Sequence, residues 1–155
     1  MAHILIVDDD EIVAAMVSEI LIAKGHACGW VTSGERALEL LRFKRPDLML
    51  LDQDMPGMSG AQVLRELRAS AKNYDLPVIM FTAITGARDE EMALFNGAQD
   101  YIRKPFDPKF LDLKVRQALA VRAEGPKHRD LRDHLAQSSG ASPELSPAFF
   151  KRRIV

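Results

Sequence analysis

The sequence predicts an α/β fold in which a five-stranded parallel sheet carries helices on both of its faces, a doubly wound arrangement. Short apolar runs alternate with amphipathic stretches along the first 122 residues, and most of the runs are apolar throughout. Such runs are typical of parallel strands buried on both faces. Strands that alternate with helices pair in parallel through right-handed crossovers, which place the helices on both sides of the sheet.

The first two strand–helix units occupy roughly the first 45 residues. His3 to Val7 is a continuous apolar run and predicts the first strand, and apolar residues at helical spacing then predict a helix that ends at Lys24-Gly25. Residues 27–32 predict a second strand. Ser33-Gly34 then opens a helix that stops before Pro46, because the residue before a proline disfavours helical geometry.

The same unit repeats through the rest of the domain. Leu48 to Leu51 is apolar throughout and Asp52 closes it, and Pro77 and Thr82 bound another apolar run in the same way. The remaining strands are therefore predicted at residues 48–51, 78–81 and 100–103, and the remaining helices at about 61–71, around 90–95 with Gly97 closing it, and from Pro108 to about Val121.

The composition changes near residue 123. The last stretch is rich in Gly, Ser and Pro and holds few core-type residues before Phe149. We therefore expect residues 1–122 to form one domain and residues 123–155 to form a flexible or partly helical tail, with no output domain. A short helix over about 127–137 would bury little apolar surface.

Composition excludes several classes of function. The chain carries 21 basic and 22 acidic side chains, so its formal charge of -1 gives no general attraction to nucleic acid or to anionic membranes. Cys28 is the single cysteine and cannot form an internal disulfide. No apolar run approaches the roughly 20 residues that span a bilayer. We expect a cytoplasmic protein with neither a nucleic-acid nor a membrane partner.

Polar residues stand where the predicted strands end. Asp8 and Asp9 follow the first strand, Asp52 ends the third, Thr82 ends the fourth and Lys104 follows the fifth. Ligands of open α/β sheets bind outside the carboxyl ends of the strands. These five residues therefore form the candidate site. Asp10 is better explained as a helix cap.

Three carboxylates that converge need a cation or a proton, because each close pair repels by about 4 kcal/mol at an effective dielectric near 20. Oxygen ligands beside a phosphate suit Mg²⁺, which would neutralise Asp52 and an incoming phosphoryl group together. Asp52 can then act as a nucleophile toward phosphorus. Lys104 supplies a compact positive charge, and the Thr82 hydroxyl can donate to a phosphoryl oxygen.

Four segments resemble the signature segments of two-component response-regulator receiver domains, in matching order and spacing. The resemblance covers residues 1 to about 122 and implies the flavodoxin-like receiver fold with strand order 2-1-3-4-5 and five helices. The segments are ILIVDD (4–9), PDLMLLDQDMPGMSG (46–60), PVIMFTA (77–83) and GAQDYIRKPF (97–106).

The resemblance also implies a role for each site residue. Asp52 would be the phosphorylated residue, and Mg²⁺ would be held by Asp9, Asp52 and the backbone carbonyl of Asp54. Asp8 would act mainly through metal-bound water. Lys104 would precede a cis bond to Pro105, a geometry that proline adopts at modest cost.

Thr82 and Tyr101 match the switch pair of the family. Phosphorylation would move the hydroxyl toward the phosphoryl group and turn the ring inward, which changes the surface of helix four, strand five and helix five. The resemblance implies a histidine kinase or histidine phosphotransfer protein as the donor, in a two-component system or phosphorelay. A downstream protein target would read the switched surface, which could also pair with a second copy of the chain.

Three alternatives stay open at this point. The Asp52-Gln53-Asp54 spacing is similar to the Asp-x-Asp of haloacid-dehalogenase-type phosphatases, although Pro56 departs from their pattern and no cap domain is apparent. A flavodoxin-like cofactor binder would need N–H and hydroxyl donors after the first strand, where this chain has aspartates. A receiver that only binds partners is the third. A signalling phosphoacceptor, which catalyses only its own phosphorylation and dephosphorylation, is the reading that the residues favour.

Overall fold

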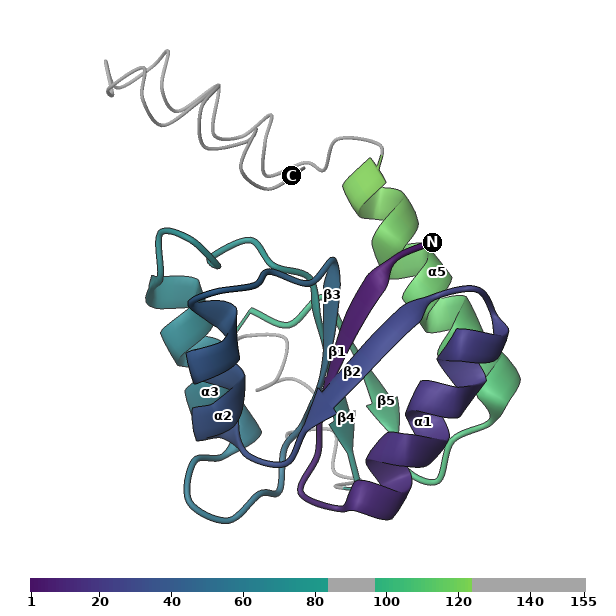
Figure 1. Cartoon of the computed structure of the whole chain (residues 1–155), viewed down its shortest axis with the longest axis horizontal. Coiled ribbons are helices and arrows are strands. Elements are labelled where there is room, and N and C mark those ends of the chain that lie inside the picture. The colour runs from purple at the N-terminus through teal and green to yellow at the C-terminus, as the bar shows by residue number, and fades with distance from the viewer. Residues whose placement is uncertain (84–96, 124–155) are drawn as a thin grey trace. The chain divides into compact units, whose positions relative to one another are not determined.

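A computed structural model of the chain describes residues 1–83 and 97–123 (Figure 1). The chain divides into two units, residues 1–119 and 120–155, and the fold and the site below belong to the first. The helix predicted around residues 90–95 and the predicted tail beyond Ala123, with its short helix, lie outside the described residues.

The sheet has five parallel strands in the order β2-β1-β3-β4-β5, as expected. β1, β3 and β4 each have a neighbouring strand on both sides, and their apolar residues are almost completely enclosed. The strands are β1 (His3–Val7), β2 (Ala27–Val31), β3 (Leu48–Asp52), β4 (Val78–Thr82) and β5 (Asp100–Arg103).

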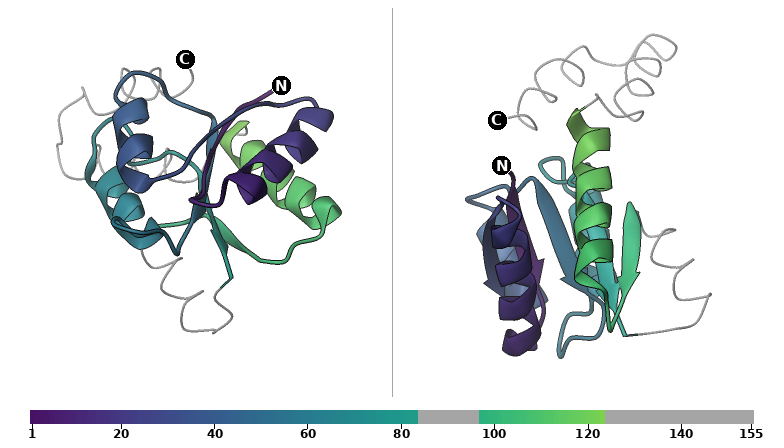
Figure 2. Two further views of the ribbon diagram at one scale, coloured as in Figure 1. Left: turned by 60° about the horizontal axis from the view of Figure 1, so that its bottom comes forward. Right: turned by 90° about the vertical axis from the view of Figure 1, so that its right-hand side faces the viewer.

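Two layers of helices cover the sheet. α2 and α3 lie together on one face, and α1 and α5 lie on the other, as two views show (Figures 1 and 2). Four of the five predicted helices thus fall within the described residues: α1 (Glu11–Ala23), α2 (Gly34–Leu41), α3 (Gly60–Ala69) and α5 (Pro108–Ala123). The predicted doubly wound α/β fold is confirmed.

The helices begin where the sequence places capping side chains. The Asp10 carboxylate accepts hydrogen bonds from the amides of Ile12 and Val13, and the Ser33 hydroxyl accepts one from Arg36. Ser59 and Gln62 form a capping box at the start of α3. Each cap fixes where the chain turns from the end of a strand or loop into a helix.

The core consists of two apolar clusters, one on each face of the sheet. Alternate residues of a strand point to opposite faces, so Leu5 and Met49 join the cluster under α2 and α3, whereas Ile4 and Leu50 join the cluster under α1 and α5. The central strands are therefore held from both sides. Their carboxyl ends, which share one edge in Figure 2, are positioned by the core rather than by loops.

Gly60 offers a test of how closely α3 approaches the end of β3. A Cβ at Gly60 would lie 2.4 Å from the carbonyl oxygen of Asp52, a contact that only a backbone shift can relieve. We expect Gly60→Ala to lower the free energy of unfolding by about 2 kcal/mol in urea denaturation, as overpacking does.

Gly29→Ala is the matched control, since a Cβ at Gly29 meets nothing within 4 Å. It should change stability by less than about 0.5 kcal/mol. Equal stability of the Gly60→Ala variant and the unaltered chain would contradict the close approach.

Candidate phosphoacceptor site

Three carboxylates meet at the carboxyl edge of the sheet. One oxygen from each of Asp8, Asp9 and Asp52 lies within 4.8 Å of the others. Asp8 and Asp52 follow or end the central strands and are buried, with 0% and 4% of their surface exposed, whereas Asp9 is exposed. We call these three residues the acidic cup. It is closed on the core side and open to solvent at Asp9.

Lys104 is the counter-charge of the cup. Its Nζ donates to Asp8 Oδ2 at 2.8 Å and to Asp52 Oδ1 at 3.3 Å, so the ammonium bridges the two buried carboxylates. The backbone N–H of Lys104 donates to the Thr82 carbonyl, which fixes the chain at this edge as it leaves β5. The cis peptide bond between Lys104 and Pro105, expected from the sequence, is present.

The sequence did not reveal which carboxylate Lys104 prefers. Asp8 receives the shorter contact, and its other oxygen accepts the backbone N–H of Asp10 at 3.0 Å. Both oxygens of Asp8 thus have partners within the protein, whereas Asp9 faces solvent. Asp8 therefore holds Lys104 in place, and the carboxylates of Asp9 and Asp52 are more available than that of Asp8 to bind a metal ion.

An aromatic ring also supports Lys104. Its Nζ lies 4.8 Å from the ring centroid of Phe81, a cation–π distance, and Phe81 packs against Phe106 with ring centroids 5.0 Å apart. Both residues adjoin predicted site residues, since Phe81 precedes Thr82 and Phe106 follows the Lys104-Pro105 pair. The only sequence signal for Phe81 and Phe106 was therefore their position next to predicted site residues.

Charge and burial compete at Asp52. Burial raises the pKa of its carboxyl to about 7, and the negative charge of Asp8 and a hydrogen bond with Asp9 act in the same direction. Lys104 opposes them by its charge and its hydrogen bond. A carboxylate nucleophile must be ionised, so a further cation in the cup would favour the reactive form.

Lys104 shows the complementary effect. Its burial disfavours the charged ammonium, but the hydrogen bond that it donates to Asp8 and the charges of Asp52 and Asp8 outweigh that effect and raise the pKa of Lys104. The ammonium thus stays charged at neutral pH. One positive charge faces three carboxylates, and their oxygens fit the all-oxygen coordination of Mg²⁺.

Thr82 and Tyr101 are on neighbouring strands. Tyr101 is opposite Met80 and Thr82 is opposite Arg103, so Thr82 and Tyr101 are diagonal neighbours on one face of the sheet. Thr82 is buried and ends β4 beside Lys104, whereas Tyr101 is half-buried against the core cluster under α2 and α3. The predicted switch pair is therefore adjacent.

Asp54 lies two residues beyond Asp52, and its side chain is exposed. Its carboxylate is not one of the three that cluster in the described part of the chain. The prediction for Asp54 concerned its backbone carbonyl, and that assignment stays a prediction.

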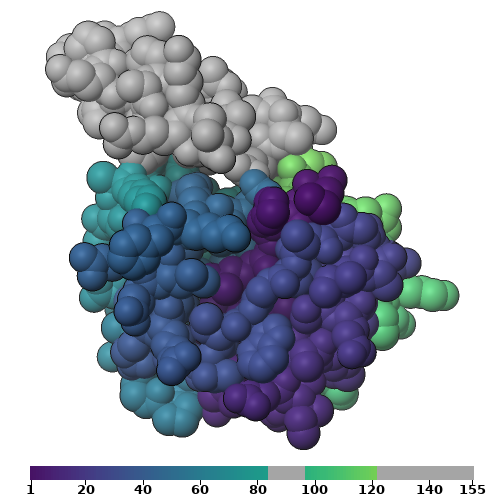
Figure 3. All heavy atoms as spheres, in the orientation of Figure 1, coloured from purple at the N-terminus to yellow at the C-terminus, as the bar shows by residue number. Residues whose placement is uncertain are grey.

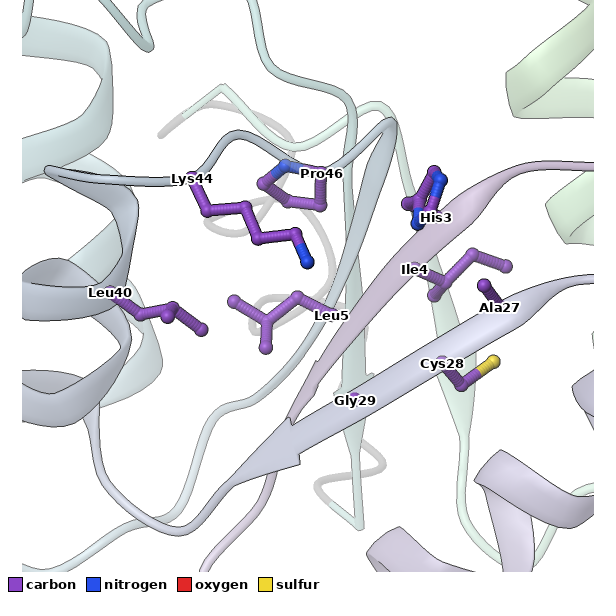
Figure 4. Close-up of a pocket in the computed structure, with 9 residues that line it drawn as sticks. All are labelled: His3, Ile4, Leu5, Ala27, Cys28, Gly29, Leu40, Lys44 and Pro46. Carbon is purple, nitrogen blue, oxygen red and sulfur yellow. The ribbon is translucent and has the colours of Figure 1, made fainter.

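A pocket of about 310 Å³ lies away from the cup, toward the amino ends of β1 and β2. Figure 3 shows the hollow on the face that carries α2 and β2, and Figure 4 shows Leu5, Leu40 and Pro46 around it, with Lys44 at its side. None of the predicted site residues lines it. This pocket and the candidate site are thus at different places.

Comparison with known proteins places these observations in a family. The model of the response regulator receiver domain matches residues 4–116. The DNA-binding response regulator MtrA of Mycolicibacterium paratuberculosis is 37% identical over 156 residues, a match that spans 96% of this chain and 68% of MtrA. The transcriptional regulatory protein AfsQ1 of Streptomyces coelicolor is 36% identical over 77% of this chain and 52% of its own length.

Solved structures agree with the sequence relatives. The receiver domain of a signal transduction histidine kinase from Syntrophus aciditrophicus superposes with a TM-score of 0.72 at 33% identity, over 77% of this chain and 91% of that one. The chemotaxis protein CheY4 of Vibrio cholerae superposes with a TM-score of 0.73 at 28% identity, over 77% of this chain and 99% of that one.

Among the described residues, no helix is both long and apolar enough to cross a membrane.

The raised pKa of Asp52 predicts how stability depends on pH without metal. Because ionisation of Asp52 is disfavoured in the folded protein, the contribution of this group to stability falls as pH rises from its ordinary pKa of 3.8 to about 7, and the loss is complete above that. In EDTA near pH 8, we expect Asp52→Asn to raise the free energy of unfolding by about 1–3 kcal/mol. Urea denaturation at several pH values measures this.

Asp54→Asn is the control, because it removes an exposed carboxylate from the same segment. Its effect should stay below about 0.5 kcal/mol at every pH. A loss of stability in Asp52→Asn across the whole pH range would contradict the view that burial and repulsion together disfavour the ionised Asp52 carboxyl.

Proposed function

The chain belongs to the response regulator receiver family, and from this membership we propose that Asp52 is the residue that accepts the phosphoryl group. One observation carries the assignment. Asp52 ends a central strand and lies between two further carboxylates and an ammonium, with its Oδ1 3.3 Å from Lys104 Nζ. A carboxylate in such surroundings is oriented before any donor arrives, and the ammonium offsets part of the negative charge around it.

The proposed reaction is a transfer between two side chains. A carboxylate oxygen of Asp52 forms a bond to phosphorus, while the bond between phosphorus and the imidazole nitrogen of a donor phosphohistidine breaks. The released nitrogen takes up a proton from solvent. Lys104 moves from pairing with Asp52 to pairing with an oxygen of the new acyl phosphate, and Thr82 donates its hydroxyl to another.

Mg²⁺ is the proposed cofactor, held by Asp9 and Asp52 and by the carbonyl of Asp54. When bound, it would neutralise the carboxylates and the oxygens of the phosphoryl group. The partners of Asp8 support its assignment to the outer sphere, because Lys104 and the amide of Asp10 already occupy both of its oxygens. Asp9 is exposed and suits the entrance through which a hydrated ion reaches the cup.

The proposed output is a change of surface. Thr82 moves toward the phosphoryl group, and the diagonal neighbour Tyr101 turns inward into the space beside it. The surface around β5 and α5 would then bind a downstream protein or a second copy of the chain. The donor is a histidine kinase or a histidine phosphotransfer protein, and a cytoplasmic location is part of the same proposal.

DNA-linked output is a second candidate for a protein that contains this chain. MtrA is named as a DNA-binding response regulator, and its similarity runs over 96% of this chain. This chain spans about two thirds of the length of MtrA. We therefore propose only the receiver function, for residues 1–122, and propose that residues 123–155 form a tail that follows the receiver domain.

A signalling role, rather than turnover of phosphate esters, completes the proposal. A receiver acts on itself and stops after one phosphoryl group, whereas a phosphatase with an Asp-x-Asp motif releases phosphate continuously. The exposed Asp54 carboxylate does not join the acidic cup, which disfavours it as the second acid of such an enzyme.

A receiver should take up one phosphoryl group per chain. Incubation with acetyl phosphate and Mg²⁺ should add one phosphoryl group to the chain, and Asp52→Asn should abolish the addition. Intact-protein mass spectrometry measures both. Steady release of phosphate from a generic ester, or an unmodified chain that nevertheless binds Mg²⁺, would contradict the assignment.

Asp9 and Lys104 should contribute to two different steps, Mg²⁺ binding and phosphoryl transfer. Asp9→Ala should weaken Mg²⁺ binding, because it removes a direct ligand. Lys104→Ala should leave Mg²⁺ bound yet slow phosphorylation by about 100-fold, as loss of a charge-stabilising donor does. Calorimetric titration and the rate of mass gain measure the two effects, and equal behaviour of the two variants would refute the division of roles.

A further inference from the structure

The connection from β3 to α3, residues 53–59, joins the phosphoacceptor to the next helix. It carries Asp54, whose carbonyl is the proposed third ligand of Mg²⁺. Asp54, Pro56 and Gly57 are exposed, so burial alone does not fix the path of this segment. The position of the carbonyl must then depend on specific contacts along the loop.

Two contacts hold the loop at its ends. After Asp52, the Gln53 carbonyl accepts the amide of Gly60 at 3.0 Å, and the Gln53 side chain accepts the amide of Ala61 at 2.9 Å. Met55, in the middle, is 8% exposed and belongs to the core cluster under α2 and α3. These contacts tie the loop to α3 and to the core.

A further contact comes from a different helix. Glu35, in the first turn of α2, accepts the backbone N–H of Met58 through Oε1 at 3.0 Å, across 23 positions of the chain. Gly57 has a φ of +76°, and a Cβ there would lie 3.1 Å from the same oxygen. The loop thus turns closely around the Glu35 carboxylate, in a backbone conformation that favours glycine.

The base of this contact is rigid. Gly34, next to Glu35, is packed so closely that a Cβ would lie 2.5 Å from Val63 Cγ2 of α3 and 3.3 Å from Met58 Cβ. The start of α2 therefore has little freedom to move relative to α3. A carboxylate that projects from this fixed point can hold the loop amide in one place.

We propose that Glu35 is a positioning residue for the metal-binding loop: by accepting the Met58 amide it sets the path of residues 54–58 and so the affinity of the cup for Mg²⁺. The inference rests on the proposed function, because it takes the Asp54 carbonyl as a ligand. Glu35 itself touches neither the metal nor the phosphoryl group. Its effect reaches the site through the backbone alone.

Three single variants of the full chain separate positioning from charge. Glu35→Ala removes the acceptor, Glu35→Gln keeps an acceptor oxygen but removes the charge, and Glu39→Ala removes a charge from an exposed position of the same helix. Mg²⁺ is titrated calorimetrically into each. Hydrogen exchange of the Met58 amide is followed without Mg²⁺, and thermal unfolding confirms that each variant is folded.

We expect Glu35→Ala to bind Mg²⁺ about 3- to 10-fold more weakly and to exchange the Met58 amide faster by a similar factor, the net effect of one hydrogen bond. Glu35→Gln and Glu39→Ala should stay within about twofold of the unaltered chain. Unchanged affinity in Glu35→Ala, or equal weakening in Glu35→Gln, would overturn the inference. Absence of Mg²⁺ binding in the unaltered chain would instead refute the proposed function on which it rests.

Discussion

The structure depends on one electrostatic constraint, the convergence of three carboxylates at the carboxyl edge of a parallel sheet. Two of them, Asp8 and Asp52, are buried because their strands are central. A single ammonium, from Lys104, bridges the buried pair, so three formal negative charges meet one positive charge. Burial, together with the negative charge of Asp8, raises the pKa of Asp52 to about 7. A divalent cation is the natural completion of such a site.

The buried and the more exposed residues of the site have different surroundings. The buried carboxylates stand at the ends of β1 and β3, which two core clusters hold from both faces. Asp9, Thr82 and Tyr101 lie at the entrance or at the side of the cup, where an ion, a phosphoryl group or a turning ring can be accommodated. In the proposed function, the Asp52 nucleophile is thereby pre-positioned, and the neighbouring β4–β5 edge carries the signal.

Much of this arrangement followed from the sequence for physical reasons. Strands buried on both faces produce continuous apolar runs, and parallel pairing brings their carboxyl ends to one edge, so the cup of Asp8, Asp9 and Asp52 was predictable from where the runs end. The caps at Asp10 and Ser33 were equally readable. The comparisons confirm the family that four short segments indicated.

Other features depend on side-chain geometry between distant segments. Three contacts are of this kind: the shorter contact of Lys104 with Asp8, the ring of Phe81 beside the ammonium, and the hydrogen bond that the Met58 amide donates to Glu35. They join residues 23 to 96 positions apart or depend on one rotamer.

A crystal of the chain soaked with Mn²⁺, whose anomalous signal locates the ion, shows whether the acidic cup holds a divalent cation. We expect one ion bonded to carboxylate oxygens of Asp9 and Asp52. An ion bound elsewhere while the cup stays empty would contradict it.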